Sequence, residues 1–311
     1  KLRCVINLMF LALVGYQSFA QEHRKSFGQN RLQFKNFDWY YYSTDNFDVH
    51  YYNDGQEYAK LALDFLEDEY DNLTDVLGYA PYAKTKIFLY NSPSDLLQSN
   101  IGVDGSTFTI AGQTNFTKLQ VEIAFPGSIS AYKKELHYKI SKMLIEDMMF
   151  GGSLAEMFQS AYLLNLPEWF VDGASKYIAY GWDVEMDDYV RDYFSTTKGS
   201  KLTKIKNLES ERAVMIGQSM WNFIGLKYGR SNISNILNLT RIIRNVENSI
   251  ASTLGVPFEQ FMTNWIEYYQ RSNDMVSNGY VSPMESEVIE GDGRKQINFN
   301  NVKFSPDGKH V

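Results

Sequence analysis

The chain has 311 residues, of which 44% are hydrophobic and 22% are charged, a composition that can bury a sizeable core and excludes a disordered protein. Its formal net charge is -7 and it has no polybasic footprint, which argues against nucleic acid as a partner. A chain of this length is more typical of two folded units than of one.

Residues 1–20 have the features of a secretory signal. Lys1 and Arg3 precede an apolar run over residues 5–14, and the stretch "SFA" ends at Ala20, so we expect export and cleavage after Ala20. The apolar run is shorter than the roughly 20 residues that span a bilayer, and no later run approaches that length, which predicts a mature chain without a transmembrane span. The only cysteine, Cys4, lies in this segment, so the mature chain has no thiol for a disulfide, a nucleophile or a metal ligand.

The rest of the chain predicts a small sheet followed by a helical majority. Residues 21–37 form a polar linker, and the alternating aromatics of 38–52 predict one or two strands, for which strand packing is favoured over a sugar or peptide platform. A helix over 55–78 ending at Gly78, a strand over 84–92 and two strands within 105–125 follow. Helices are then predicted over 131–150, 153–165, 167–180, 184–195, 213–228, 231–245 and 257–272. The expected fold class is α+β, with one domain over 38–272.

The C-terminal residues change in character. Residues 273–294 are polar and lack apolar periodicity, which indicates a linker. Residues 295–311 read as strand, Pro-Asp-Gly turn and strand, and "FSPDGK" (304–309) resembles the blade signature of TolB-type β-propellers. This resemblance implies that 295–311 are the first strands of a propeller, truncated at Val311, whereas an ordinary hairpin at a domain end is the alternative.

Three phrases in the helical part occur in an order that characterises one enzyme class. They are "DMMFGGS" (147–153), "WFVDGASKY" (169–177) and "GQSMWNFIGLKYG" (217–229). Together with the strands before them, they resemble peptidase-MA-like gluzincin domains that precede TolB-type propellers in bacterial envelope proteins. In that family an H-E-x-x-H helix supplies two zinc ligands and the general base, and a Glu on a following helix supplies the third ligand.

The resemblance places this chain's residues at those positions, and none of them has the family's residue type. Tyr138, Lys139 and Lys142 stand where the family has His, Glu and His, and Asp172 stands where it has the third ligand. The four histidines, at 23, 50, 137 and 310, include no two that are four apart, and His137 is expected on the surface or in the core rather than as a ligand. We therefore predict a degenerate zinc site, no metal, no cofactor and no catalytic residues.

A charge pair is our hypothesis for what replaces the metal as a link between the two helices. Asp172 would reach Lys142, or Lys139, with Tyr138 filling the space of an imidazole, since positions 138 and 142 share one helix face. The alternative is that both lysines extend into solvent and contribute nothing.

Other catalytic patterns are weaker. "FGGS" (150–153) lacks the spacing of a phosphate-binding loop, and no G-x-S-x-G elbow is present. Glu146, Asp147 and Glu156 could form an acid/base pair, although each lies at a helix position where a solvated charge is the ordinary explanation.

The sequence thus supports three functional interpretations. The favoured one is a secreted, non-catalytic pseudopeptidase that binds or scaffolds envelope or outer-membrane proteins, in the periplasm or at the outer membrane. An active hydrolase, using an unrecognised zinc site or a carboxylate site, is the alternative. A structural envelope subunit with a closed cleft is the third.

Overall fold

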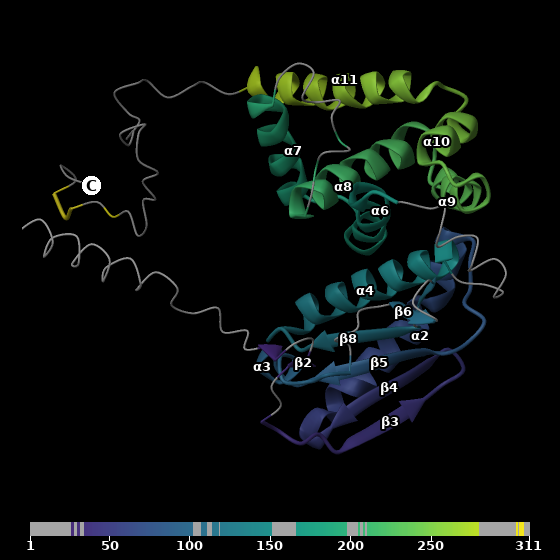
Figure 1. Ribbon diagram of the computed structural model, residues 1–311. Coiled ribbons are helices and arrows are strands. Elements are labelled where there is room, and N and C mark those ends of the chain that lie inside the picture. Colours follow the sequence, from purple (N-terminus) through teal and green to yellow (C-terminus); the bar gives the residue numbers. More distant parts are fainter. Residues whose placement is uncertain are drawn as a thin grey trace, which may run out of the picture. The chain divides into compact units, whose positions relative to one another are not determined.

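A computed structural model describes residues 26–27, 30–31, 34–101, 107–110, 114–117, 119–150, 166–197, 205, 208, 210–279, 303 and 305–307 (Figure 1). The chain divides into two compact units, Lys1–Tyr269 and Gln270–Val311. In the second unit, Pro306 and Asp307 lie in a turn, as predicted, while the strands expected on either side fall outside the described residues. The predicted signal peptide and the predicted helix over 153–165 also fall outside them.

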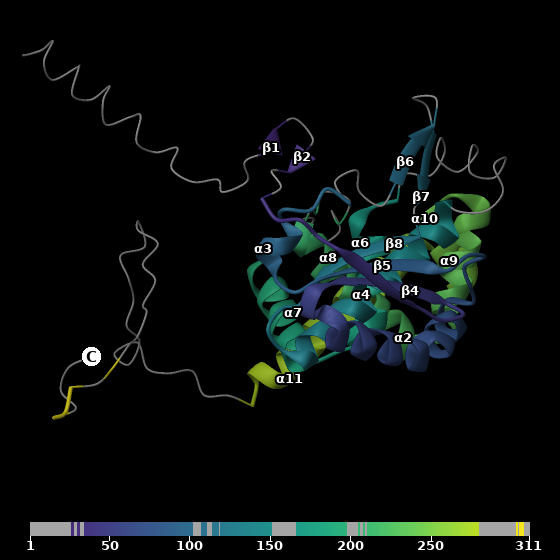
Figure 2. The ribbon, with the colours of Figure 1, turned by 90° about the horizontal axis from the view of Figure 1, so that it is seen from below.

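The first unit begins with a four-stranded mixed sheet (Figure 2). Its strand order is β3 (Trp39–Ser43), β4 (Phe47–Tyr52), β5 (Thr85–Tyr90) and β8 (Gln120–Ala124), with β3 antiparallel to β4 and the other neighbours parallel. Two small antiparallel pairs accompany it, β1 (Ser26–Phe27) with β2 (Asn30–Arg31) and β6 (Thr107–Ile110) with β7 (Thr114–Thr117). The sequence predicted two strands within residues 105–125, whereas the structure has three there: β6, β7 and β8.

Helices α2 (Gln56–Leu77) and α4 (Ile129–Phe150) cover one face of this sheet. Alternate strand residues such as Val49, Ile87 and Ile123 are buried against them in a single hydrophobic core. Helix α2 ends, as predicted, at Gly78, whose φ of 61° is a left-handed conformation that glycine adopts without steric cost. Two short helical segments, η2 (Asn53–Gly55) and α3 (Pro93–Leu96), lie in the connections.

Aromatic residues pack on the opposite face of the sheet. The Trp39 ring lies edge-on to those of Tyr52 and Phe88, at centroid distances of 5.2 and 5.4 Å. The buried Tyr52 hydroxyl donates to Asp95 Oδ2 at 2.6 Å and accepts from the Asn91 backbone N–H at 2.9 Å. The alternation in 38–52 therefore serves strand packing, as favoured, although Tyr40 and Tyr41 on β3 remain 58% and 62% exposed.

The residues just before β3 are attached to this sheet. The Lys35 ammonium pairs with Asp95 Oδ2 at 2.9 Å, and the Phe37 ring lies 4.7 Å from that of Tyr52. The polar linker predicted over 21–37 is thus wrong at its C-terminal end. The sequence could not indicate these contacts, because Asp95, the partner of Lys35, lies 60 residues further along the chain.

The remainder of the described chain is helical. It comprises α6 (Glu168–Tyr180), α7 (Val184–Thr196), α8 (Ser210–Lys227), α9 (Ser231–Ile243), α10 (Val246–Leu254) and α11 (Phe258–Ser277). Helix α10 was missed, and α11 continues past residue 272, where its predicted end and the start of a linker had been placed. The α+β class is confirmed. In the described residues, no helix combines the length and the apolar character needed to cross a membrane.

Helices α6 and α8 approach each other unusually closely through two glycines. A Cβ on Gly217 would lie 2.0 Å from the Trp169 carbonyl oxygen, and one on Gly173 would lie 2.6 Å from the backbone of Gly217. The Trp221 indole N–H on α8 donates to the Phe170 carbonyl oxygen at 2.9 Å. These contacts fix α6, and with it the side chain of Asp172, which directly precedes Gly173.

Candidate functional site

The four predicted site positions lie on two adjacent helices. Tyr138, Lys139 and Lys142 are on α4, and Asp172 is on α6. The two helices lie side by side because each contributes apolar residues, such as Ile145 and Phe170, to the same core. The structure therefore brings together residues that are about thirty positions apart in the sequence.

Lys142 and Asp172 form the predicted ion pair. Lys142 Nζ lies 2.7 Å from Asp172 Oδ1, and the side chains are 37% and 14% exposed. Asp172 Oδ1 has no hydrogen-bond partner among the described residues, so the contact is described as an ion pair. It is a charge contact between helices, partly shielded from solvent, and it confirms the hypothesis for Lys142.

Lys139 has different partners. Its Nζ donates to the backbone carbonyl oxygen of Glu122 on β8 at 3.0 Å and lies 3.8 Å from Glu135 Oε1, one turn earlier on α4. The alternative in which both lysines extend freely into solvent is therefore wrong. The sequence carried no signal for the contact with Glu122, since a backbone acceptor can be any residue type.

Tyr138 lies beside the ion pair and faces Tyr180 on α6, with ring centroids 6.2 Å apart. Burial, followed by the negative charges of Asp172 and Glu135, raises the pKa of the Tyr138 hydroxyl above its usual range. The phenol is therefore neutral at physiological pH and can only donate or accept hydrogen bonds there. Whether it fills the space of an imidazole stays a prediction.

Of the three other candidate carboxylates, Asp147 has a clear partner. It is buried on α4 and accepts a short hydrogen bond from the Tyr79 hydroxyl. Burial raises the pKa of Asp147, and the hydrogen bond from Tyr79 opposes this effect. Glu146 is its neighbour on α4, and Glu156 lies outside the described residues. The Tyr79 contact gives Asp147 a structural explanation that the sequence pattern did not indicate.

The histidines are dispersed. His137 on α4 is mostly buried, 6.2 Å from the Phe65 ring, and burial lowers its pKa. His50 on β4 stacks on Phe88 at 4.5 Å, and positions 23 and 310 lie outside the described residues. Among the residues that the structure describes, no group of three or more His, Cys, Asp and Glu side chains could hold a metal ion.

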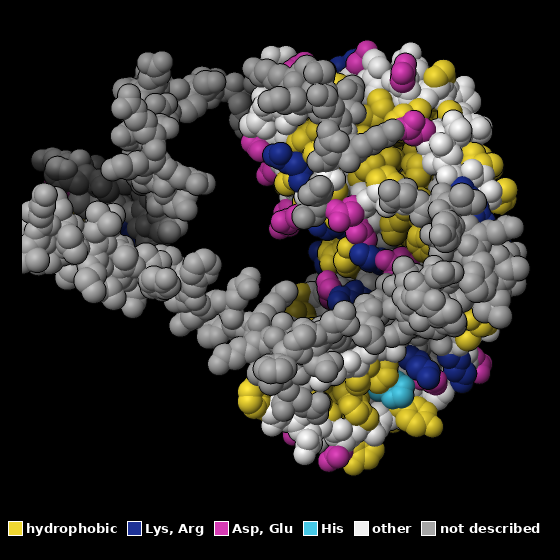
Figure 3. Space-filling model, in the orientation of Figure 1, with side chains coloured by type: hydrophobic (Ala, Val, Ile, Leu, Met, Phe, Trp, Pro, Cys, Tyr) yellow, Lys and Arg dark blue, Asp and Glu magenta, His cyan; other side chains and the backbone are white. Residues whose placement is uncertain are grey.

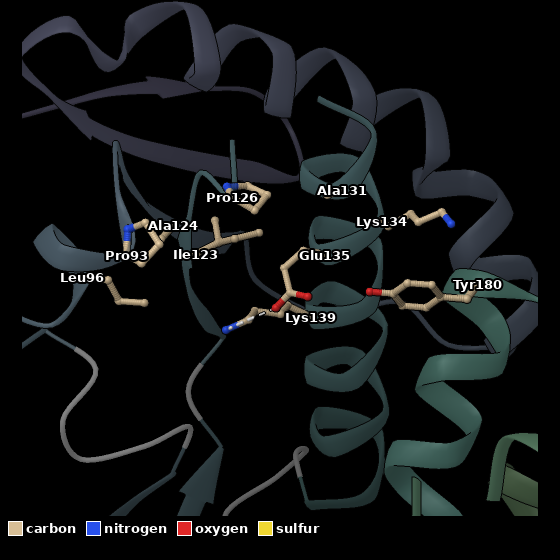
Figure 4. A pocket seen from close by; sticks show the side chains of 10 residues that line it. All are labelled: Pro93, Leu96, Ile123, Ala124, Pro126, Ala131, Lys134, Glu135, Lys139 and Tyr180. Atoms are coloured by element: carbon tan, nitrogen blue, oxygen red, sulfur yellow. Dashed lines mark ion pairs between the residues drawn. The ribbon is translucent and has the colours of Figure 1, made fainter. Parts of the chain in front are cut away.

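A pocket of about 360 Å³ lies beside Lys139 (Figure 4). Its polar lining residues are Glu135, Lys139 and Tyr180, and its apolar lining residues are Pro93, Leu96, Ile123, Ala124, Pro126 and Ala131. Lys134, also on the lining, has its ammonium 5.7 Å from the Tyr180 ring. Figure 3 shows basic and acidic side chains next to one another near the middle of the drawn face. The pocket lining itself has mixed charge, since it includes Lys134, Glu135 and Lys139.

The sequence was compared with models of known protein families and with curated proteins. No model of a known protein family matches the sequence. No curated protein matches it closely enough to serve as a relative.

Proposed function

We propose that the chain is an exported, non-catalytic module with the architecture of a gluzincin-type peptidase, which binds protein partners in the bacterial envelope. The observation that carries this proposal is the ion pair between Lys142 and Asp172, 2.7 Å apart, at two of the positions where the resemblance expects zinc ligands. The ordered phrases from "DMMFGGS" to "GQSMWNFIGLKYG" support the architecture. The "FSPDGK" phrase supports a propeller as a second interaction platform.

The chemistry of the four side chains does not fit a zinc ion. A catalytic zinc takes three ligands of the imidazole, thiolate or carboxylate type and keeps one position open for water. Here an ammonium group is paired with Asp172, the only carboxylate of the four, and its charge would repel a dication. The Lys139 ammonium donates a hydrogen bond to a backbone carbonyl oxygen, and it cannot act as the base that the family's Glu provides. Lys142 and Asp172 instead join α4 to α6 directly, through their ion pair.

Partner binding is tested by affinity purification of the whole chain from gently solubilised envelopes, with cross-linking and mass spectrometry. We expect defined envelope or outer-membrane proteins to be recovered in stoichiometric amounts and to survive moderate salt. Recovery of the chain alone would contradict a binding or scaffolding role. Stoichiometric zinc by elemental analysis, with chelator-sensitive cleavage of an unstructured protein, would show an active metal-dependent hydrolase. Cleavage that resists chelation would point to a carboxylate site.

The architecture is tested separately by restoring the family's residues. A variant that combines Tyr138→His, Lys139→Glu, Lys142→His and Asp172→Glu should bind one zinc per chain if the four positions converge as the resemblance implies. A control with the first three changes and Asp172→Ala lacks the third ligand and should bind zinc at least about tenfold more weakly. Equal zinc binding by the two variants would contradict the assignment of Asp172.

A further inference from the structure

Strand β8 lies at the edge of the sheet. Among the described strands it pairs with β5 alone, and β6 and β7 pair with each other. The Lys86 N–H donates to the Leu119 carbonyl oxygen at 2.8 Å, and the Phe125 N–H donates to the Tyr90 carbonyl oxygen at 2.8 Å, so the odd-numbered residues bond toward β5. Because successive residues of a strand direct their backbone groups to opposite sides, the even-numbered residues of β8 direct theirs away from the sheet.

An edge of this kind is a template for another strand. Unpaired N–H and C=O groups in a row can pair with an extended segment of a partner or with the same edge of a second copy. Proteins protect such edges with short strands, with charged side chains, especially lysine, or with a covering element. The five-residue length of β8 is one such protection, and Glu122 is the central residue of the strand.

Lys139 occupies that central point. Its ammonium, reaching from α4, donates to the outward carbonyl oxygen of Glu122 at 3.0 Å. Glu135 Oε1 forms an ion pair with the same ammonium at 3.8 Å. Figure 4 shows the Lys139 side chain extending from α4 beside the segment that carries Ile123. The Glu122 side chain is held as well, since its Oε1 accepts from the Tyr90 hydroxyl at 2.7 Å. A docking strand would have to displace the lysine before it could pair with Glu122.

We propose that Lys139 is a strap that closes the β8 edge against strand addition, and that the occupant it excludes is a second copy of this chain. The same edge on two copies is self-complementary, because antiparallel pairing about a twofold axis satisfies both rows of backbone groups. This inference goes beyond the proposed function, because it concerns the association of the chain with a second copy of itself and not its binding of another protein. It does not depend on who the partner is.

The test is the self-association of Lys139→Met in the whole chain, measured by sedimentation equilibrium over a range of concentrations. Methionine keeps an apolar stem of similar length and removes the donor. We expect the dimer dissociation constant to fall at least about tenfold below that of the unmodified chain. Lys134→Met is the matched control, because it makes the same charge change on the same helix and lining, and its ammonium lies over the Tyr180 ring instead of on β8.

Hydrogen exchange identifies the surface that associates. In dimers of Lys139→Met, the outward amides of Gln120, Glu122 and Ala124 should exchange more slowly than in the monomer. Association without this protection, or equal association of Lys134→Met, would overturn the proposal, as would an unchanged dissociation constant. Glu135→Gln retains the lysine but removes its carboxylate anchor, so a smaller change in the same direction supports the strap even if Lys139→Met folds poorly. These outcomes leave the recovery of envelope partners, which tests the proposed function, unaffected.

Discussion

The ion pair between Lys142 and Asp172 makes a prediction whose size follows from its geometry. Two unit charges 2.7 Å apart attract by about 6 kcal/mol at an effective dielectric constant of about 20. Desolvation of Asp172, at 14% exposure, offsets most of this attraction, and solvent screening at Lys142, at 37% exposure, reduces it further. We therefore expect a net coupling free energy of about 1 to 2 kcal/mol.

A double-mutant cycle measures this coupling. Asp172→Asn, Lys142→Met and the double variant are compared with the unmodified chain by urea denaturation at low salt. Lys142→Met should be at least as destabilising as Asp172→Asn, because it leaves the less exposed partner charged and unpaired. The double variant should be more stable than the sum of the single losses implies. A coupling below about 0.3 kcal/mol would refute the reasoning that this pair joins α4 to α6.

Three further predictions concern the framework around the site. Gly217→Ala should lower the free energy of unfolding by about 2 kcal/mol or more, measured by urea denaturation, because its Cβ would lie 2.0 Å from a backbone carbonyl oxygen; a loss below about 0.5 kcal/mol would show that α6 and α8 can separate freely. Tyr52→Phe should cost about 1 to 3 kcal/mol, since it removes one buried and one partly buried hydrogen bond, whereas Tyr40→Phe, at a 58% exposed position, should cost under about 0.5 kcal/mol in the same assay. The raised pKa of Asp147 means that its contribution to stability is full below the carboxyl's ordinary pKa and is lost as pH rises through the folded-state pKa. Asp147→Asn, which keeps an acceptor for Tyr79, should therefore gain stability relative to the unmodified chain as pH rises above the ordinary carboxyl pKa of about 4; a difference that does not change with pH would contradict this.

Much of the fold was predictable because its signals are local. The period of two in 38–52, the helical spacing before Gly78 and the helices predicted from 131 onward are patterns within one element. Apart from the helix over 153–165, which falls outside the described residues, each corresponds to an observed strand or helix. The missed elements are short or atypical. Helix α10 has nine residues, and its Asn245 cap resembles a turn residue in sequence.

The site was predictable only where both partners carry opposite charges. Asp172 and Lys142 could be paired from residue type once the two helices were assumed to be adjacent. The contacts of Lys139 with Glu122 and of Asp147 with Tyr79 could not be predicted, because one uses a backbone acceptor and the other joins segments that no pattern links.

The sequence by itself determined the α+β class, the order of most elements and the opposite charges of Lys142 and Asp172, since residue type and periodicity are properties of the chain alone. Tertiary structure alone decided which lysine pairs with Asp172, which strand forms the sheet edge and what occupies that edge. Those outcomes depend on how far a side chain reaches between elements that are distant in sequence, and that distance is set by the packing of α4 against β8 and α6.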